Sequence, residues 1–323
     1  MTFSNRLRSI AADASRLALG AALGVGLVVA LAGSPARAWA QAAEAPAVSS
    51  GVVPAEGDGP ALWVIRDEDS TLYLFGTVHV LKPDTAWGSA KVDAAFDSAS
   101  DIWFEISNPD DQAAILPLIQ QHGISPDRPL SSLLTAEEFA ELDAAAATIG
   151  ASGQQMDVFR PWFAGLTLSV APLAKAGYDP NSGVELVLKA RAEAAGKPVH
   201  GFETLDKQVR ILAGMSEEVQ LGFLRETLED FENAATILDG MVEDWSTGDV
   251  EGLNQTVVAE MKTDAPEVYE ALLVHRNTDW ADQIQTLLEG SGTAFIAVGA
   301  AHLTGDDSVQ AILAQRGVEA VRQ

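Results

Sequence analysis

The sequence predicts an α/β protein whose central β-sheet comes from the N- and C-terminal halves of the chain, with a mostly helical middle insertion. Two observations support this fold class. Short runs rich in β-branched and aromatic residues, typical of buried strands, occur towards both ends of the chain: 62–65, 71–75, 101–106 and 293–298. Between them, Ala- and Leu-rich segments repeat their apolar residues at helical spacing up to about residue 195 and again over 217–288.

The first elements are a predicted hairpin, a helix and a strand. The polar stretch 66–70 separates two apolar runs, as a turn does between antiparallel strands. An amphipathic helix is expected over 89–98. The run 101–106 then predicts a short buried strand that contains one acidic residue, Glu105.

The remaining elements alternate between helices and two further strands. Breaks in the helical pattern are expected near four residues: Pro126, Gly150, Pro161 and Pro180. A strand over 198–203 leads into a helix that Thr204 or Asp206 could cap. After the buried strand 293–298, a helix near 308–316 and a short final strand close the chain.

Composition narrows the classes of function. The 323 residues include 46 Asp and Glu against 20 Lys and Arg, a net charge of −26. This charge argues against nucleic acid as a partner and against a polybasic membrane dock. The chain has no cysteine, which excludes disulfides, Cys-ligated zinc, iron–sulfur clusters and thiol nucleophiles. Any metal must therefore be held by His, Asp, Glu or backbone oxygen.

The first forty residues predict a secretory signal peptide. Arg6, Arg8 and Arg16 precede an apolar run over 17–31 without charge, and the small residues of Ala38-Trp39-Ala40 suit a cleavage site. The alternative is an uncleaved membrane anchor, because the run approaches the length that spans a bilayer. We therefore expect a periplasmic or secreted protein that is cleaved near Ala40 and meets the membrane only if this segment is retained.

Two regions follow the predicted signal peptide. Residues 41–58 are rich in Ala, Pro, Gly and Glu, which predicts a flexible lead-in. Residues 59–323 are expected to form a single domain. No solenoid-type repeat, Gly-x-Ser-x-Gly elbow, His-Glu-x-x-His helix or phosphate-binding P-loop is present in the sequence.

A pair of matching motifs is the main sign of chemistry. Gly76-x-x-His79 and Gly299-x-x-His302 each follow a predicted buried strand directly. A glycine there lets the backbone leave the sheet sharply or approach a ligand closely. Each imidazole is then presented at the carboxyl edge of its strand, where α/β folds place their sites. We expect both histidines to meet in one pocket.

Two acids at strand ends could join the histidines in a divalent-metal site. Glu105 lies in an apolar strand, where a carboxylate is costly unless it is paired or bound to metal. The alternative is that Glu105 reaches the surface and forms a salt bridge. Glu203 precedes a helix, and its alternative is an interaction with the helix dipole. Ordinary structural roles are expected for the other three histidines: His122, His200 and His275.

An ordered set of residues resembles the TraB/GumN family, which is related to Tiki-type peptidases and more distantly to ChaN and erythromycin-esterase proteins. The resemblance covers about residues 60–323. The matching segments are Leu74-Phe75-Gly76-Thr77-Val78-His79, Trp103-Phe104-Glu105, Arg160-Pro161-Trp162, Asp179-Pro180 with Gly183-Val184-Glu185, Gly196-Lys197-Pro198-Val199 with Glu203-Thr204 and Gln208, Arg276-Asn277, and Val298-Gly299-Ala300-Ala301-His302.

The resemblance implies an α/β core of two related halves, each supplying one Gly-x-x-His. In the Tiki-like branch these histidines and a Glu form the centre of a metal-dependent peptidase that prefers manganese or cobalt to zinc. GumN-like members are often associated with polysaccharide biosynthesis through their operons.

The resulting hypothesis is metal-assisted hydrolysis of a peptide or amide bond, with a peptide or small molecule as substrate. His79, His302 and Glu105 are the expected metal ligands. Glu203 is expected to act as general base or further ligand, Arg276 to stabilise an oxyanion, and Asn277 to orient substrate or a ligand. Two alternatives are a non-catalytic periplasmic binding module for a peptide or haem-like ligand, and an accessory protein of polysaccharide biosynthesis or export.

Overall fold

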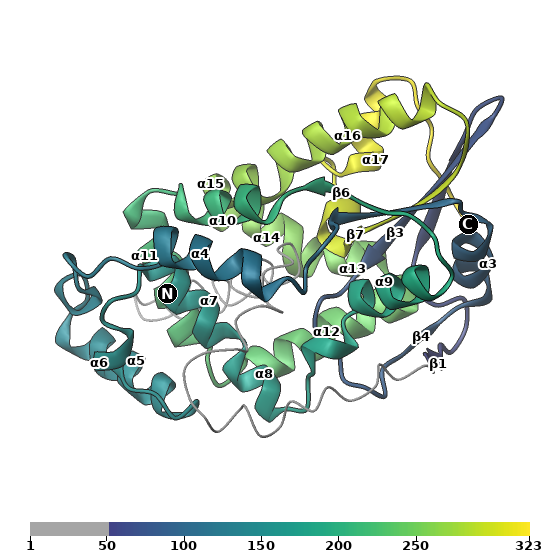
Figure 1. Ribbon diagram of the computed structural model, residues 1–323. Helices are drawn as coiled ribbons and strands as arrows, with labels where there is room; N and C mark the ends of the chain where they lie inside the picture. The colour runs from purple at the N-terminus through teal and green to yellow at the C-terminus, as the bar shows by residue number, and fades with distance from the viewer. Residues whose placement is uncertain (1–51) are drawn as a thin grey trace, which may run out of the picture.

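A mixed six-stranded sheet is the framework of the protein (Figure 1). The computed structural model describes residues 52–323, so the predicted signal peptide and residues 41–51 of the predicted lead-in lie outside the described residues. The α/β fold class predicted from the sequence is confirmed. In spatial order the strands are β6 (Val199–Glu203), β5 (Asp101–Ile106), β7 (Gly292–Gly299), β3 (Ser70–Thr77), β2 (Leu62–Arg66) and β8 (Val321–Arg322).

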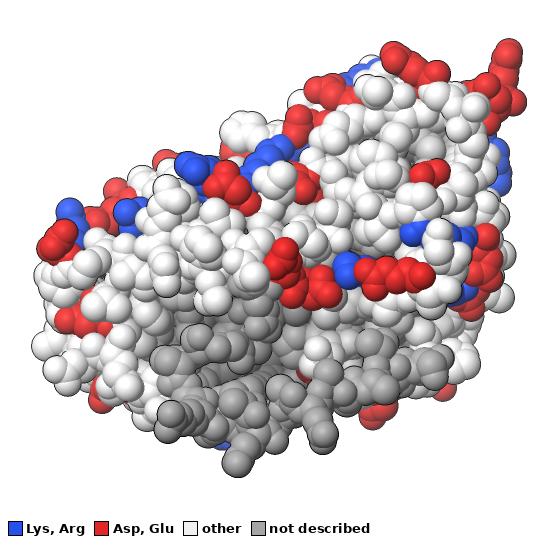
Figure 2. All heavy atoms as spheres, in the orientation of Figure 1, with Lys and Arg blue, Asp and Glu red and all other residues white. Residues whose placement is uncertain are grey.

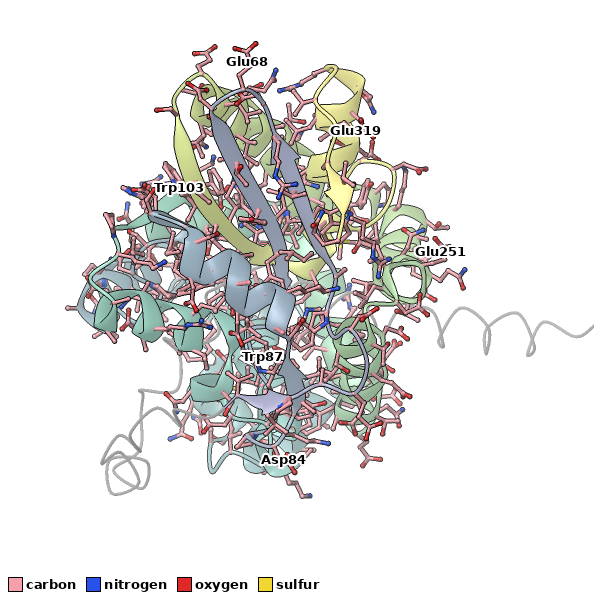
Figure 3. The ribbon with its side chains drawn as sticks, turned by 90° about the vertical axis from the view of Figure 1, so that its right-hand side faces the viewer. Glu68, Asp84, Trp87, Trp103, Glu251 and Glu319 are labelled. Atoms are coloured by element: carbon pink, nitrogen blue, oxygen red, sulfur yellow. The ribbon has the colours of Figure 1, made fainter. Side chains whose placement is uncertain are left out.

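The register of this sheet joins the two ends of the sequence. Strands β3 and β7 run parallel, with Gly76 opposite Val298 and Thr77 opposite Gly299. Strand β5 runs parallel to both β6 and β7. The predicted hairpin is confirmed as the antiparallel pair β2–β3, and β8 adds antiparallel to β2. Four parallel strands therefore end at one edge, away from the hairpin turn at Glu68 (Figure 3).

Helices cover both faces of the sheet, and further helices form a region beyond its edge (Figure 1). The α-helices are α3 (Ala90–Ser98), α4 (Gln112–His122), α5 (Ala136–Ala147), α6 (Gly153–Met156), α7 (Pro161–Ser169), α8 (Ala171–Lys175), α9 (Val184–Ala194), α10 (Leu205–Ala213), α11 (Glu217–Glu229), α12 (Ala234–Thr247), α13 (Val250–Leu253), α14 (Ala259–Asp264), α15 (Pro266–Tyr269), α16 (His275–Leu288) and α17 (Val309–Gln315). The shorter elements are the 3₁₀ turns η2 (Leu130–Ser132), η3 (Pro180–Ser182) and η6 (Ala300–Leu303), the π-helical turns η4 (Asn254–Val258) and η5 (Glu270–Val274), and the strand pair β1 (Val53–Pro54) and β4 (Ala86–Gly88).

Alternation along the strands sends side chains to two different cores. In β3, Phe75 joins the larger core with α3, while Leu74 joins a second core with α16 and α17. Strand β7 divides in the same way, because Phe295 faces the larger core and Ile296 the second. Both faces of the sheet are thus buried, which explains why these strands read as continuous apolar runs.

Several predicted boundaries agree closely with the structure. Thr204 is the N-cap of α10, where its side chain accepts a hydrogen bond from the amide of Lys207. Pro161 begins α7 at its first position, where the missing amide hydrogen is not needed. The predicted flexible lead-in differs in part, because Val53–Pro54 form the strand β1, which pairs with β4. Among the described residues, no helix combines the length and apolar character needed to cross a bilayer.

The acidic character of the chain is visible on its surface and in one helix. Acidic side chains, with fewer basic ones between them, are spread along the face in Figure 2. On α11, burial together with the neighbouring carboxylates Glu229, Asp230 and Asp264 raises the pKa of Glu226 to about 8. The folded protein therefore holds a proton on Glu226 that the unfolded chain releases near pH 4.5.

This proton makes stability depend on pH in a defined direction. Stability should fall as the pH rises from about 4.5 to 8, because the folded state must lose a proton that it holds tightly. Glu226→Gln removes the ionisation, so it should stabilise the protein by about 2 kcal/mol at pH 8 and by almost nothing at pH 4.5. Urea denaturation at both pH values measures the difference. The exposed Glu243→Gln is the control, and an equal effect of Glu226→Gln at both pH values would contradict the prediction.

Candidate active site

The two Gly-x-x-His motifs lie at the carboxyl ends of the neighbouring strands β3 and β7. A Cβ atom on Gly76 would lie 3.1 Å from the Cα of Ala300, so the glycine allows η6 to pack directly against the end of β3. His302 lies on η6 and is fully buried, and His79 follows β3 with only 4% of its surface exposed. The tertiary fold therefore brings both motifs to one edge of the sheet.

Glu105 lies at the centre of a buried network at this edge. One carboxylate oxygen, Oε1, accepts a 2.8 Å hydrogen bond from the Gly299 amide and lies 3.7 Å from Nε2 of His302. The other, Oε2, accepts from Nη2 of Arg276 at 2.6 Å and from Nε2 of Gln208 at 3.1 Å. Because the residue is only 2% exposed, the alternative of a surface salt bridge does not apply.

The guanidinium of Arg276 joins this carboxylate to a second one. Arg276 is 2% exposed and donates to both oxygens of Glu203, from Nε at 3.0 and 3.2 Å and from Nη2 at 2.9 Å. Burial raises the pKa of Glu105, and Arg276 opposes that rise. For Arg276, burial acts to lower the pKa, but the carboxylates of Glu105 and Glu203 outweigh it and raise the pKa. The cation is therefore held charged between two carboxyl groups.

His302 is held at both ring nitrogens. Its Nδ1 lies 2.6 Å from Oδ1 of Asn277, and its Nε2 lies 3.0 Å from Nη1 of Arg276. A guanidinium only donates hydrogen bonds, so Nε2 accepts and Nδ1 carries the hydrogen that Asn277 receives. The ring of Trp280 lies 4.3 Å away, centroid to centroid. Asn277 in turn donates to the backbone oxygen of Asp307 at 2.8 Å, which fixes its amide orientation.

The π-helical turn η5 leads directly into the helix that supplies Arg276 and Asn277. Arg276 also donates from Nη1 to the backbone oxygen of Leu272 in η5 at 3.3 Å. Successive residues on a helix point in directions about 100° apart. Arg276 can therefore face the carboxylates while Asn277 faces His302.

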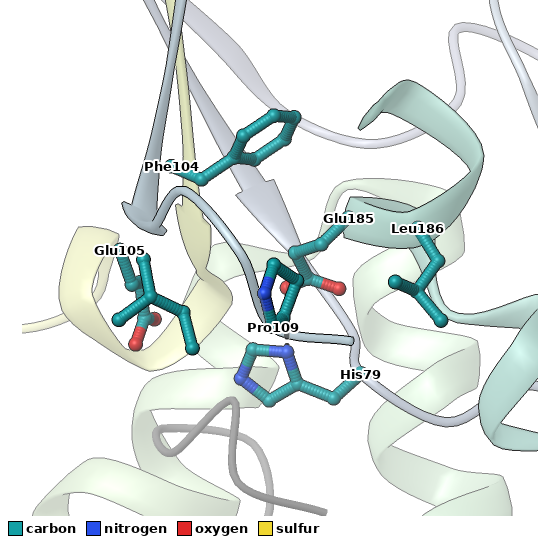
Figure 4. A pocket seen from close by; sticks show the side chains of 7 residues that line it. His79, Phe104, Glu105, Pro109, Glu185 and Leu186 are labelled. Atoms are coloured by element: carbon teal, nitrogen blue, oxygen red, sulfur yellow. Dashed lines mark ion pairs between the residues drawn. The ribbon is translucent and has the colours of Figure 1, made fainter. Parts of the chain in front are cut away.

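His79 lines a small pocket together with Glu105 and a carboxylate from α9, Glu185 (Figure 4). Its Nδ1 lies 2.6 Å from Oε1 of Glu185. Burial alone would lower the pKa of His79, but the charge of Glu185 outweighs it and raises the pKa. Nε2 of His79 is buried and has no hydrogen-bond partner within the described part of the chain. The pocket has room for about one water molecule and is lined by His79, Phe104, Glu105, Ile106, Pro109, Glu185 and Leu186.

The segment that carries Glu185 is paired with the segment that carries His79. The amide of Val184 donates to the oxygen of Val78 at 3.0 Å, and the amide of Asp179 donates to the oxygen of Leu81 at 2.9 Å. A Cβ atom on Gly183 would lie 2.2 Å from the backbone oxygen of His79, so only glycine fits there. This close backbone contact places the first turn of α9 beside the imidazole.

The predicted site residues separate into two connected groups. His79 and Glu105 line the pocket, whereas His302, which was expected in the same pocket, is not among its lining residues and lies 3.7 Å from Glu105. The remaining three, Glu203, Arg276 and Asn277, lie in the buried network behind Glu105. Over residues 52–323, no cluster of three or more His, Asp or Glu side chains has the spacing of a metal site. The catalytic and ligand roles assigned to these residues stay predictions.

Two polar residues of the site were not assigned a role from the sequence. Glu185 pairs with a histidine 106 positions away, and Gln208 bridges Glu105 and Glu203 with hydrogen bonds of 3.1 and 3.3 Å. No local pattern reveals either contact. The available signal was that both residues belong to the segments that match the TraB/GumN pattern.

The other three histidines lie outside the pocket lining. His122 is the last residue of α4. His200 on β6 lies 3.2 Å from Asp101 and stacks on Trp103. His275 is exposed and begins α16. These positions agree with the structural roles expected for them.

Comparisons with known proteins find one matching family and several similar proteins. The model of the TraB/PrgY/gumN family matches residues 61–322. An uncharacterized protein of Treponema pallidum (strain Nichols) is 24% identical over 281 residues, which cover 79% of this chain and 80% of that protein. The uncharacterized protein YbaP of Escherichia coli (strain K12) is 22% identical over 256 residues, which cover 79% of this chain and 92% of YbaP. No solved structure matches.

Proposed function

The chain belongs to the TraB/PrgY/gumN family, and from this premise we propose that it is an exported, divalent-metal-dependent hydrolase of peptide or amide bonds. The observation that carries the proposal is the buried Nε2 of His79, which has no hydrogen-bond partner among residues 52–323 and belongs to a residue that lines a pocket with Glu105. An unsatisfied buried nitrogen costs about 1–3 kcal/mol, so a ligand bound in the pocket would relieve that cost.

The donor set fits a divalent ion. Imidazole nitrogen and carboxylate oxygen, without thiolate, are ligands that manganese and cobalt accept. His79 would bind through Nε2 and Glu105 through its carboxylate, with His302 as the third ligand. For His302 to take part, Arg276 must give up its 3.0 Å contact with Nε2. A bound ion would supply an activated water and polarise the carbonyl of the substrate.

The surrounding residues prepare the pocket for this chemistry. Arg276 donates hydrogen bonds to both buried carboxylates and balances their negative charge. Its position beside Glu105 would also let it stabilise negative charge that develops on the substrate. Glu203 uses both oxygens on Arg276 and Gln208, and this arrangement favours a role in holding Arg276. Glu105, in contrast, reaches the pocket itself. Asn277 fixes the ring of His302 through Nδ1.

The first test is metal content combined with turnover. The protein, dialysed with Mn²⁺ or Co²⁺, should retain about one ion per chain by elemental analysis and should hydrolyse members of a quenched-fluorescence peptide library. His79→Ala and His302→Ala should lose both properties, whereas the exposed His275→Ala should keep both. Circular dichroism melting confirms that each variant is folded. Unchanged metal content in His79→Ala would discard the site, and metal retention without turnover would favour a non-catalytic binding module.

Export is tested separately. The proposal rests on the charged start, the apolar run and the small residues before position 41. Expression of the full chain in a Gram-negative host should give a periplasmic or secreted product whose N-terminus begins near Gln41. A product that keeps its N-terminus and sediments with membranes would instead support an anchored protein.

A further inference from the structure

A buried carboxylate, which itself accepts a hydrogen bond from a buried hydroxyl, holds the imidazole of His79 in one orientation. Oε1 of Glu185 lies 2.6 Å from Nδ1 of His79 and also accepts a hydrogen bond from the hydroxyl of Thr77. Thr77 is fully buried, and Glu185 and His79 are 7% and 4% exposed. Figure 4 shows the carboxylate of Glu185 near the ring of His79, with Pro109 drawn over the carboxylate.

The pairing decides which nitrogen of the ring is available. An ionised carboxylate only accepts hydrogen bonds, and Oε1 of Glu185 already accepts one from the hydroxyl of Thr77. Nδ1 of His79 therefore carries a hydrogen that points at Glu185. The opposite nitrogen, Nε2, is buried, has no hydrogen-bond partner in the part of the chain that the structure describes, and belongs to a residue that lines the pocket.

We infer that Glu185 is a positioning residue, which with Thr77 fixes the ring of His79 so that Nε2 serves the pocket as a ligand. The inference rests on the proposed metal-dependent function and extends it to two residues that were assigned no role from the sequence. A carboxylate on the far nitrogen of a metal-binding histidine fixes the ring and makes it a better ligand. Glu185 itself needs no contact with the ion in this arrangement.

The geometry also explains why a purely structural ion pair is an insufficient account. Burying an imidazole and a carboxylate costs several kcal/mol before their attraction is counted. Of the buried side-chain atoms without a hydrogen-bond partner among the described residues, Nε2 of His79 is the one whose residue lines the pocket with Glu105, and an ion pair that served packing alone does not explain that placement. A bound ion would give Nε2 of His79 a partner, and the contact with Glu185 explains the orientation of the imidazole ring.

The test compares matched variants by their affinity for Mn²⁺, read from the electron paramagnetic resonance signal of the free ion. Glu185→Gln keeps the shape of the side chain but loses its charge, and it should weaken Mn²⁺ binding about tenfold. Glu193→Gln, an exposed acid on the same helix, should bind as the wild type does. Thr77→Val should weaken binding in the same direction as Glu185→Gln, whereas Thr77→Ser, which restores the hydroxyl, should bind nearly as the wild type does.

The outcomes separate this inference from the proposed function. Wild-type protein that binds no Mn²⁺ overturns the proposed function and the inference with it. Wild-type protein that binds Mn²⁺ while Glu185→Gln binds equally well overturns the inference alone. If Thr77→Ser is weaker than Thr77→Val, the side chain acts through packing and its assigned role is overturned. Melting temperatures confirm that each compared variant is folded.

Discussion

Replacing Arg276 with Met is expected to destabilise the protein by about 4 kcal/mol, because it leaves two buried carboxylates without their cation. Arg276 donates at 2.6 Å to Glu105 and at 2.9 Å to Glu203, and all three residues are almost completely buried. Met fills a similar volume, so the loss of stability is caused by the missing positive charge rather than by poorer packing. Urea denaturation at pH 7 measures the change in the free energy of unfolding.

The sign of the pH dependence gives this prediction a second readout. Without Arg276, burial raises the pKa of Glu105 further, so the folded state of the variant binds protons more tightly than the unfolded chain does. The deficit of Arg276→Met should therefore shrink as the pH falls from about 7 towards 5. Arg316→Met, which breaks an exposed pair with Asp282, should cost less than about 1 kcal/mol. A similarly small cost for Arg276→Met would contradict the prediction.

Gly183→Ala is expected to have a comparably large effect, through the backbone rather than through charge. The added Cβ would lie 2.2 Å from the backbone oxygen of His79, and neither atom belongs to a flexible side chain that could move away. The two segments must separate, which should cost about 3 kcal/mol of stability. The same separation should move Glu185 away from Nδ1 of His79 and weaken Mn²⁺ binding. Thermal denaturation and Mn²⁺ affinity are the two measurements.

Gly240→Ala provides a matched control in the middle of α12. A Cβ atom there would meet nothing within 4 Å, and alanine is a better helix former than glycine. This variant should be about 0.5–1 kcal/mol more stable than the wild type, with unchanged Mn²⁺ affinity. If Gly183→Ala behaved like Gly240→Ala, the close contact with His79 would not constrain the site.

Much of the fold could be predicted from local patterns. The strand predicted over 101–106 is β5 with the same bounds, and the run 293–298 is β7 to within a residue at each end. Burial on both faces gives such strands a continuous apolar signature that survives without tertiary information. The helical middle was predicted in outline only. Its division into many short helices and two π-helical turns follows from packing that no local pattern records.

The candidate site could be predicted in part for the same reason. Each Gly-x-x-His motif can be recognised from the local sequence. Its glycine and histidine stand at the end of an apolar run, which predicts the carboxyl edge of a sheet. Glu105 stands out as an acid in an apolar run. The partners of these residues do not stand out, since Glu185 and Gln208 occupy ordinary helical positions with no distinguishing neighbours.

The sequence by itself thus determined the fold class, the strands, and the residue types that gather at the carboxyl edge. Only the tertiary structure decided that β3 and β7 are parallel neighbours, that Arg276 lies between Glu105 and Glu203, and that Glu185 holds His79. The physical reason is the range of the interactions involved. Periodicity and backbone preference act over a few residues, whereas strand register and charge pairing join side chains up to about two hundred positions apart and exist only once the chain has packed.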